Sequence, residues 1–226
     1  MQDFLRGMRL ALPIILGYLP VGFAFGVLAM QAGMSAPTVI MMSVFVYAGS
    51  AQLIAADLYG GGTGTVGIIL TTFIVNLRHL LMSAALTPHL KTWSRPLQAW
   101  FGFELTDEAF AANLGRFYTS GVNKGEALGL NLASHLGWVM GSVIGALFDS
   151  AIGDVKPFGL DFALPAMFIA LLLPHFAVPR RVLAMFFGAA LSLVFAVLGA
   201  GQWNVMLATI GAATLAAFLP AKEKGA

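Results

Sequence analysis

Cysteine is absent from the 226 residues, and charged residues are scarce, at 10% of the chain. Without cysteine there can be no disulfide framework, no thiolate metal site and no cysteine nucleophile. A soluble domain carries about 25% charged residues, so this scarcity argues against a soluble protein. The formal net charge is only +2, and the basic residues lie mostly at the ends of apolar segments, so nucleic-acid binding is not indicated.

Long apolar runs fill most of the chain, and hydrophobic residues make up 59% of it. A transmembrane helix needs about 20 mostly apolar residues. The sequence therefore predicts an all-α, polytopic transmembrane helical bundle in a lipid bilayer, as a single domain over residues 1–226. Seven spans are expected, and an eighth, Leu97–Tyr118, is ambiguous because it is aromatic but carries acids. The seven lie at about Ala11–Gly33, Thr38–Tyr59, Thr65–Leu86, Leu128–Ile152, Phe162–Ala177, Arg181–Ala200 and Trp203–Leu219.

The positions of the basic residues constrain the topology, because Lys and Arg favour cytoplasmic loops. If Leu97–Tyr118 crosses the membrane, the N-terminus lies inside with Arg6 and Arg9. If it does not cross, the N-terminus lies outside with both arginines. Both alternatives place Arg116, Lys124 and the C-terminus in the cytoplasm, so the positive-inside rule does not separate them.

Two glycine motifs suggest an internal repeat with halves 1–122 and 123–226. Gly22 and Gly26 lie four residues apart in the first expected span, and Gly137, Gly141 and Gly145 repeat that spacing in the first span of the second half. Small residues four apart let helix backbones approach closely, and many transporters are built from repeats. The alternative is that glycine is simply common in membrane helices.

Arg78 and His79 lie near the middle of the third expected span. A charge at that depth costs about 2.5–3.5 kcal/mol on insertion scales, so it marks a functional site unless it only holds two helices together. The nearest acid cluster is Glu104, Asp107 and Glu108. In one helix these three would share a face. We expect at least one of them to lie near Arg78, with Asp107 and Glu108 favoured; the alternative is a solvated helix on the membrane surface.

The second expected span contains a Gly-Ser pair with polar neighbours, which predicts a broken helix near Gly49 and Ser50. Tyr47, Ser50 and Gln52 can all form hydrogen bonds there. Uncapped N–H groups at a helix break can bind a carboxylate; the alternative is polar contact between helices. A cationic site for a carboxylate, an acid for an ammonium and apolar walls together suit a zwitterion.

Three motifs in order along the first half, Tyr47–Gln52, Asn76–Ser83 and Thr106–Phe110, resemble the AzlC-type branched-chain amino acid permeases, as do Pro20, Gly22 and Gly26. The resemblance implies the large subunit of a two-component bacterial exporter of leucine, isoleucine and valine in the inner membrane. It also implies a small hydrophobic AzlD-type partner subunit. Asn76, beside Arg78, completes the candidate substrate-binding or coupling residues.

The resemblance, together with the polar residues inside the spans, therefore implies a secondary exporter of branched-chain amino acids, coupled to protons. No G-x4-G-K-[ST] motif occurs, so direct ATP drive within this chain is not expected. A channel is an alternative, although no ring-forming polar repeat is present. An intramembrane enzyme is another, although neither G-x-S-x-G nor H-E-x-x-H occurs. No catalytic residue, cofactor or metal is predicted.

Overall fold

The computed structural model describes residues 1–121, 123–152, 179–199 and 204–218, with isolated positions between 157 and 176. Within those residues it contains helices and no strand, which confirms the predicted all-α bundle. The span predicted at Phe162–Ala177 and the C-terminus, predicted to be cytoplasmic, lie outside the described ranges. The chain forms two compact units, one of residues 1–62 and 75–164 and the other of residues 63–74 and 165–226.

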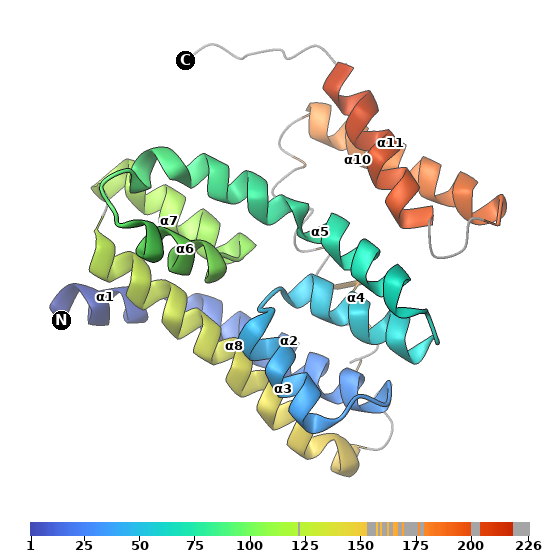
Figure 1. The fold of residues 1–226 in the computed structure, drawn as a ribbon, viewed down its shortest axis with the longest axis horizontal. Helices are drawn as coiled ribbons and strands as arrows, with labels where there is room; N and C mark the ends of the chain where they lie inside the picture. The colour runs from blue at the N-terminus through green and yellow to red at the C-terminus, as the bar shows by residue number, and fades with distance from the viewer. Residues whose placement is uncertain are drawn as a thin grey trace. The chain divides into compact units, whose positions relative to one another are not determined.

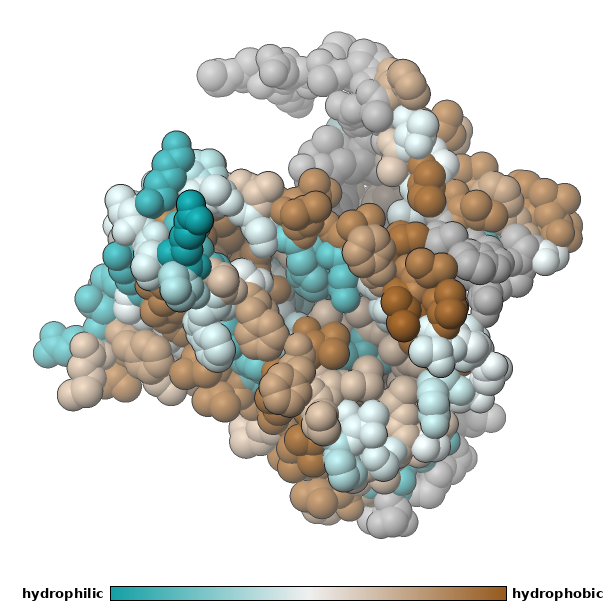
Figure 2. Space-filling model, in the orientation of Figure 1, coloured by the Kyte–Doolittle hydropathy of each residue, from teal (hydrophilic) through white to brown (hydrophobic). Residues whose placement is uncertain are grey.

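In the first unit, the predicted spans Ala11–Gly33, Thr65–Leu86 and Leu128–Ile152 each correspond to one helix, and the span at Thr38–Tyr59 corresponds to two (Figure 1). The described helices of this unit are α1 (Gln2–Leu10), α2 (Leu12–Gln31), α3 (Ala36–Phe45), α4 (Gly49–Gly60), the C-terminal part of α5 (Thr65–Leu86), a 3-10 turn (Thr87–Leu90), α6 (Arg95–Phe103), α7 (Asp107–Ser120) and α8 (Lys124–Ile152). Among the described residues, α2, α5 and α8 are long and apolar enough to cross a membrane, and α3 is shorter but apolar. Figure 2 shows apolar side chains over much of the visible face, as expected for helices in contact with lipid.

Close packing of α2 against α8 forms the centre of the first unit (Figure 1). The two helices run parallel: Ile15 lies beside Gly137, and Gly22, further along α2, lies beside Gly141. A Cβ added to Gly22 would stand 2.8 Å from the backbone oxygen of Trp138. The two glycine motifs of the sequence therefore pack on each other, because only residues without a Cβ permit this approach.

Alanine at Gly22 is expected to destabilise the protein, because the added Cβ meets backbone that cannot move aside. Overpacking of this kind costs about 1–3 kcal/mol. Gly17 is the matched control in the same helix, since a Cβ there meets nothing within 4 Å. Thermal unfolding in detergent should give a lower melting temperature for Gly22→Ala than for Gly17→Ala. Equal melting temperatures would contradict the close packing.

The second unit contains α10 (Pro179–Val197) and α11 (Asn204–Phe218), which pack against each other. Their bounds agree with the expected spans Arg181–Ala200 and Trp203–Leu219. Gly211 of α11 faces Leu191 of α10, so a small residue again lies at the helix contact.

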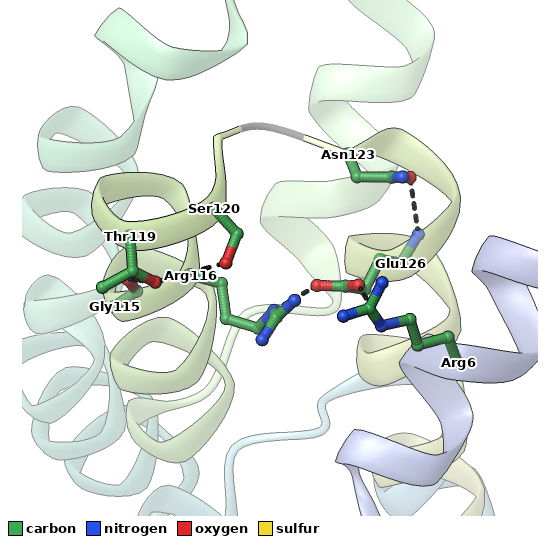
Figure 3. A network of polar contacts seen from close by, with 7 residues as sticks. All are labelled: Arg6, Gly115, Arg116, Thr119, Ser120, Asn123 and Glu126. Carbon is green, nitrogen blue, oxygen red and sulfur yellow. Dashed lines mark hydrogen bonds and ion pairs between the residues drawn. The ribbon is translucent and has the colours of Figure 1, made fainter.

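A polar network joins the start of the chain to the connection between α7 and α8 (Figure 3). Glu126, near the start of α8, forms ion pairs with Arg6 of α1, at 3.3 Å, and with Arg116 of α7. The Glu126 amide donates to the side-chain oxygen of Asn123, which caps α8. Because Arg6 and Arg116 bind one carboxylate, α1 and the end of α7 lie at the same end of this unit.

Candidate functional site

The second expected span is broken, as predicted, between α3 and α4. Helix α3 ends at Phe45 and α4 begins at Gly49. Between them Tyr47 has a φ of +44°, a conformation that bulky side chains rarely adopt. Strain of this kind persists only where surrounding contacts enforce it, and it is concentrated at functional sites.

Gln52 supplies the contacts that hold this break. Its side-chain oxygen accepts from the amide of Ala48, at 3.2 Å, and from the indole N–H of Trp138, at 3.0 Å. Its amide nitrogen donates to Ser43 Oγ at 3.2 Å, and Ser43 donates to Ser142. Since Gln52 is 0% exposed, its side chain ties α3, the break and α8 together.

The ambiguous segment Leu97–Tyr118 is also broken, so its three acids do not share the helix face that one continuous helix would give them. Helix α6 ends at Phe103, with Glu104 as its C-cap, and Thr106 starts α7 by accepting from the amide of Ala109 at 3.3 Å. Asp107 therefore begins α7 rather than continuing α6. An N-cap threonine and acids in the first turn favour a helix start here, which overrides a continuous helix.

Arg78 joins the two breaks. Its Nη1 lies 2.8 Å from Asp107 Oδ2, at the start of α7, and its Nη2 donates to Ser50 Oγ, at the start of α4, at 2.5 Å. The side chains of Arg78 and Asp107 are 26% and 28% exposed, so the pair is mostly buried. This confirms the expectation that one of the three carboxylates lies near Arg78.

Glu108 faces a different helix from Asp107. The Tyr18 hydroxyl of α2 lies 2.6 Å from both Glu108 Oε2 and Thr106 Oγ1. A hydroxyl has one hydrogen to donate, so Tyr18 donates to only one of these two oxygens at a time. Tyr18 also packs edge-on against Tyr47 at 6.4 Å between ring centroids, which connects α7 to the α3–α4 break.

Glu104 pairs with His135 of α8 instead of with Arg78 or His79. The two oxygens of Glu104 lie 3.2 and 3.0 Å from Nδ1 of His135. The other ring nitrogen lies 3.0 Å from the carbonyl oxygen of Ser43, in the last turn of α3. Tyr47 stacks on the His135 ring at 3.9 Å. Glu104 is 1% exposed and His135 8%, so this acid–base pair is buried beside the break.

Asn76 and His79 lie on α5 close to Arg78. The side-chain atoms Asn76 Oδ1 and His79 Nε2 are buried and have no hydrogen-bond partner among the described residues. The buried hydroxyl of Tyr47 likewise makes no hydrogen bond there. Unsatisfied buried polar atoms are rare in native structures.

The candidate site residues predicted from the sequence thus lie around two helix breaks, but they belong to separate clusters. Arg78, Asp107 and Ser50 form one cluster, Glu104 forms another with His135, and Gln52 lies in the network that holds the break. The sequence reasoning missed His135 and Tyr18. His135 could have been found, because a histidine within an apolar span marks a functional site by default.

Broken helices whose ends meet buried charges inside an apolar bundle are typical of membrane transport proteins. The AzlC protein family model matches residues 13–152. A branched-chain amino acid transport protein, AzlC of Bacillus subtilis, is 31% identical over 90% of this chain and 81% of its own length. An uncharacterised membrane protein of Archaeoglobus fulgidus is 33% identical over 92% of this chain and 91% of its own.

The inner membrane protein YgaZ of Escherichia coli is 32% identical over 76% of this chain and 73% of its own length. No solved structure matches the chain. The chain belongs to the AzlC family, and it is a membrane protein of a transport family.

Proposed function

We propose that this protein is a secondary active exporter of leucine, isoleucine and valine in the inner membrane of a bacterium. It works with a small hydrophobic membrane subunit and is driven by protons. The observation that carries the proposal is the position of Arg78, which contacts the first turn of α4 through Ser50 and the first turn of α7 through Asp107.

The charges of this cluster are complementary to an amino acid. The guanidinium of Arg78 and the uncapped first turn of α4 would receive the substrate carboxylate, since helix N-termini and arginine both favour anions. Asp107 would receive the ammonium group. A bound zwitterion would thus replace the Arg78–Asp107 ion pair by two ion pairs, which compensates both charges inside the membrane.

Transport in proteoliposomes tests this function. The protein, with and without its small partner, is reconstituted with radiolabelled leucine, and efflux is followed with an imposed pH gradient and without one. We expect leucine and valine to move faster than lysine, and the gradient to drive accumulation. Leucine movement no faster than in empty liposomes, with the partner present, would overturn the proposal.

The Arg6–Glu126–Arg116 network and the parallel course of α2 and α8 support a topology with the N-terminus in the cytoplasm. Both arrangements compatible with the basic residues place Arg116 inside, and Arg6 shares its carboxylate partner. An even number of crossings must then separate α1 from α8. Since α2, the α3–α4 pair and α5 supply three, α6 and α7 together supply the fourth.

Single cysteines are expected to report this topology directly, because the chain has none of its own. In intact cells a membrane-impermeant maleimide should label a cysteine at Lys91, between α5 and α6. It should fail to label cysteines at Gln2 or Gly121 until the cells are opened. Labelling of Gln2→Cys in intact cells would place the N-terminus outside and exclude four crossings before α8.

A further inference from the structure

We infer that the Glu104–His135 pair is the proton carrier that couples transport to the pH gradient; the inference rests on the proposed function. The pair is not part of the Arg78 cluster. It is formed by the C-cap of α6 and the middle of α8, and it touches the α3–α4 break at the Ser43 carbonyl and the Tyr47 ring.

The hydrogen-bond partners define how many protons the pair holds. A carbonyl oxygen only accepts, so the His135 nitrogen facing Ser43 carries a hydrogen. The second contact, between Nδ1 and the Glu104 carboxylate at 3.0 Å, needs one further hydrogen. That hydrogen makes either an imidazolium facing a carboxylate or a neutral imidazole facing a carboxylic acid. In both forms the pair holds one exchangeable proton.

Release of that proton changes the contact from attractive to repulsive. The Nδ1 lone pair would then face a carboxylate oxygen at hydrogen-bond distance with no hydrogen between them, in a site where Glu104 is 1% exposed. Unpaired buried charge is strongly unfavourable. The two side chains must therefore separate or take up water. No covalent bond other than that to the proton forms or breaks, and the proton comes from water on the more acidic side.

Separation of the pair acts on the helix break itself. The His135 ring is the hydrogen-bond donor to Ser43 at the end of α3, and Tyr47, the strained residue of the break, stacks on it. Ser50, three residues after Tyr47, binds Arg78. A movement of His135 would thus be transmitted over one short segment to the start of α4, where the substrate carboxylate is proposed to bind.

The other charged and ionisable groups around this pair are held in different contacts. Arg78 of α5 cannot lose its proton in practice, and protonation of Asp107 would leave the guanidinium without its counter-charge. Among the described residues that contact the pair, Tyr47 at the break is ionisable. Tyr47 in turn packs against Tyr18 of α2, which is bonded to Glu108 of α7. From α6, the ring of Phe103 lies against His135.

The test separates substrate movement from proton movement in proteoliposomes. Leucine–leucine exchange at equal pH needs the substrate site alone. Two other activities need the proton carrier: leucine accumulation against a gradient, and the change of internal pH that accompanies leucine movement, which a pH dye inside the liposomes reports. We expect Glu104→Gln to retain exchange and to lose both proton-linked activities. Asp57→Asn, which changes an exposed acid on α4, is the matched control and should retain all three. Proton-coupled accumulation by folded Glu104→Gln at the wild-type level would overturn the inference.

A second variant and a measurement without substrate keep the outcome clear. His135→Gln should behave as Glu104→Gln does, which covers the case in which one variant fails to fold. Hydrogen exchange of residues 43–52, corrected for the intrinsic rate, should differ between about pH 5.5 and about pH 8 in the wild type. That difference should be lost in both variants. If the wild type moves no leucine yet shows this pH-dependent protection, the proposed function fails, whereas the inference that the pair binds a proton stands. If the wild type shows no such difference, the inference about the pair is overturned.

Discussion

Replacing Arg78 by alanine is expected to abolish amino acid transport. The guanidinium holds Asp107 at 2.8 Å and reaches Ser50, so its loss removes the proposed carboxylate ligand and leaves an acid unpaired. Truncating one partner of a buried charge pair at a binding interface costs about 2–5 kcal/mol. For the proposed pair of Arg78 with the substrate carboxylate, this corresponds to a loss of at least about thirtyfold in substrate affinity. Leucine efflux and equilibrium exchange in proteoliposomes measure the loss.

Two further variants separate the ligand role of Arg78 from its structural role. In Arg78→Ala combined with Asp107→Asn, the unpaired acid is neutralised, so we expect part of the lost thermal stability to return while transport stays absent. Arg9→Ala, an exposed arginine of α1, is the matched control and should transport normally. Restored transport in the double variant would mean that Arg78 only compensates Asp107 and does not bind the substrate.

Replacing Gln52 by leucine is expected to be among the most destabilising single changes in this protein. The Ala48 amide and the Trp138 indole would each lose an acceptor, and Ser43 Oγ would lose a donor, at a residue that is 0% exposed. Each buried polar group left unsatisfied costs about 1–3 kcal/mol. Together they should lower the melting temperature by roughly 10 °C, measured by thermal unfolding in detergent.

A double-mutant cycle with Trp138 identifies the cause. Trp138→Phe removes the indole N–H that donates to Gln52, so the two substitutions together should destabilise by less than the sum of the single effects. Gln2→Leu, at an exposed position of α1, controls for the substitution itself. Strict additivity would mean that the hydrogen bond between these two residues does not contribute to holding the break.

The membrane helices could be predicted because their signal is local. The segment Thr65–Leu86 was expected from its apolar run and is helical over those residues. The break near Gly49 and Ser50 was also predictable, since a glycine next to polar residues inside an apolar run weakens a helix locally. The internal repeat with halves 1–122 and 123–226 stays a prediction.

Leu97–Tyr118 was ambiguous from the sequence, and the shared face that one helix would give its acids does not form, for a physical reason that the sequence also contains. The spacing of Glu104, Asp107 and Glu108 suits one helix face, but Thr106 followed by two acids also suits a helix start. The buried partners available to each acid favour the helix start over the continuous helix. Glu104 finds His135 on α8 and Glu108 finds Tyr18 on α2, and one continuous helix would aim all three acids in the same direction.

Sequence alone determined that this chain is an all-α membrane protein, where the apolar helices of its described residues lie, and that Arg78 needs compensation. These follow from transfer free energies and local helix propensity, which depend on residues near one another in the chain. Only the tertiary structure decided which acid compensates Arg78, because three carboxylates competed for it. It also decided that Glu104 belongs to His135, 31 residues away. Partners distant in the sequence are selected by the packing of whole helices, and no local pattern encodes that packing.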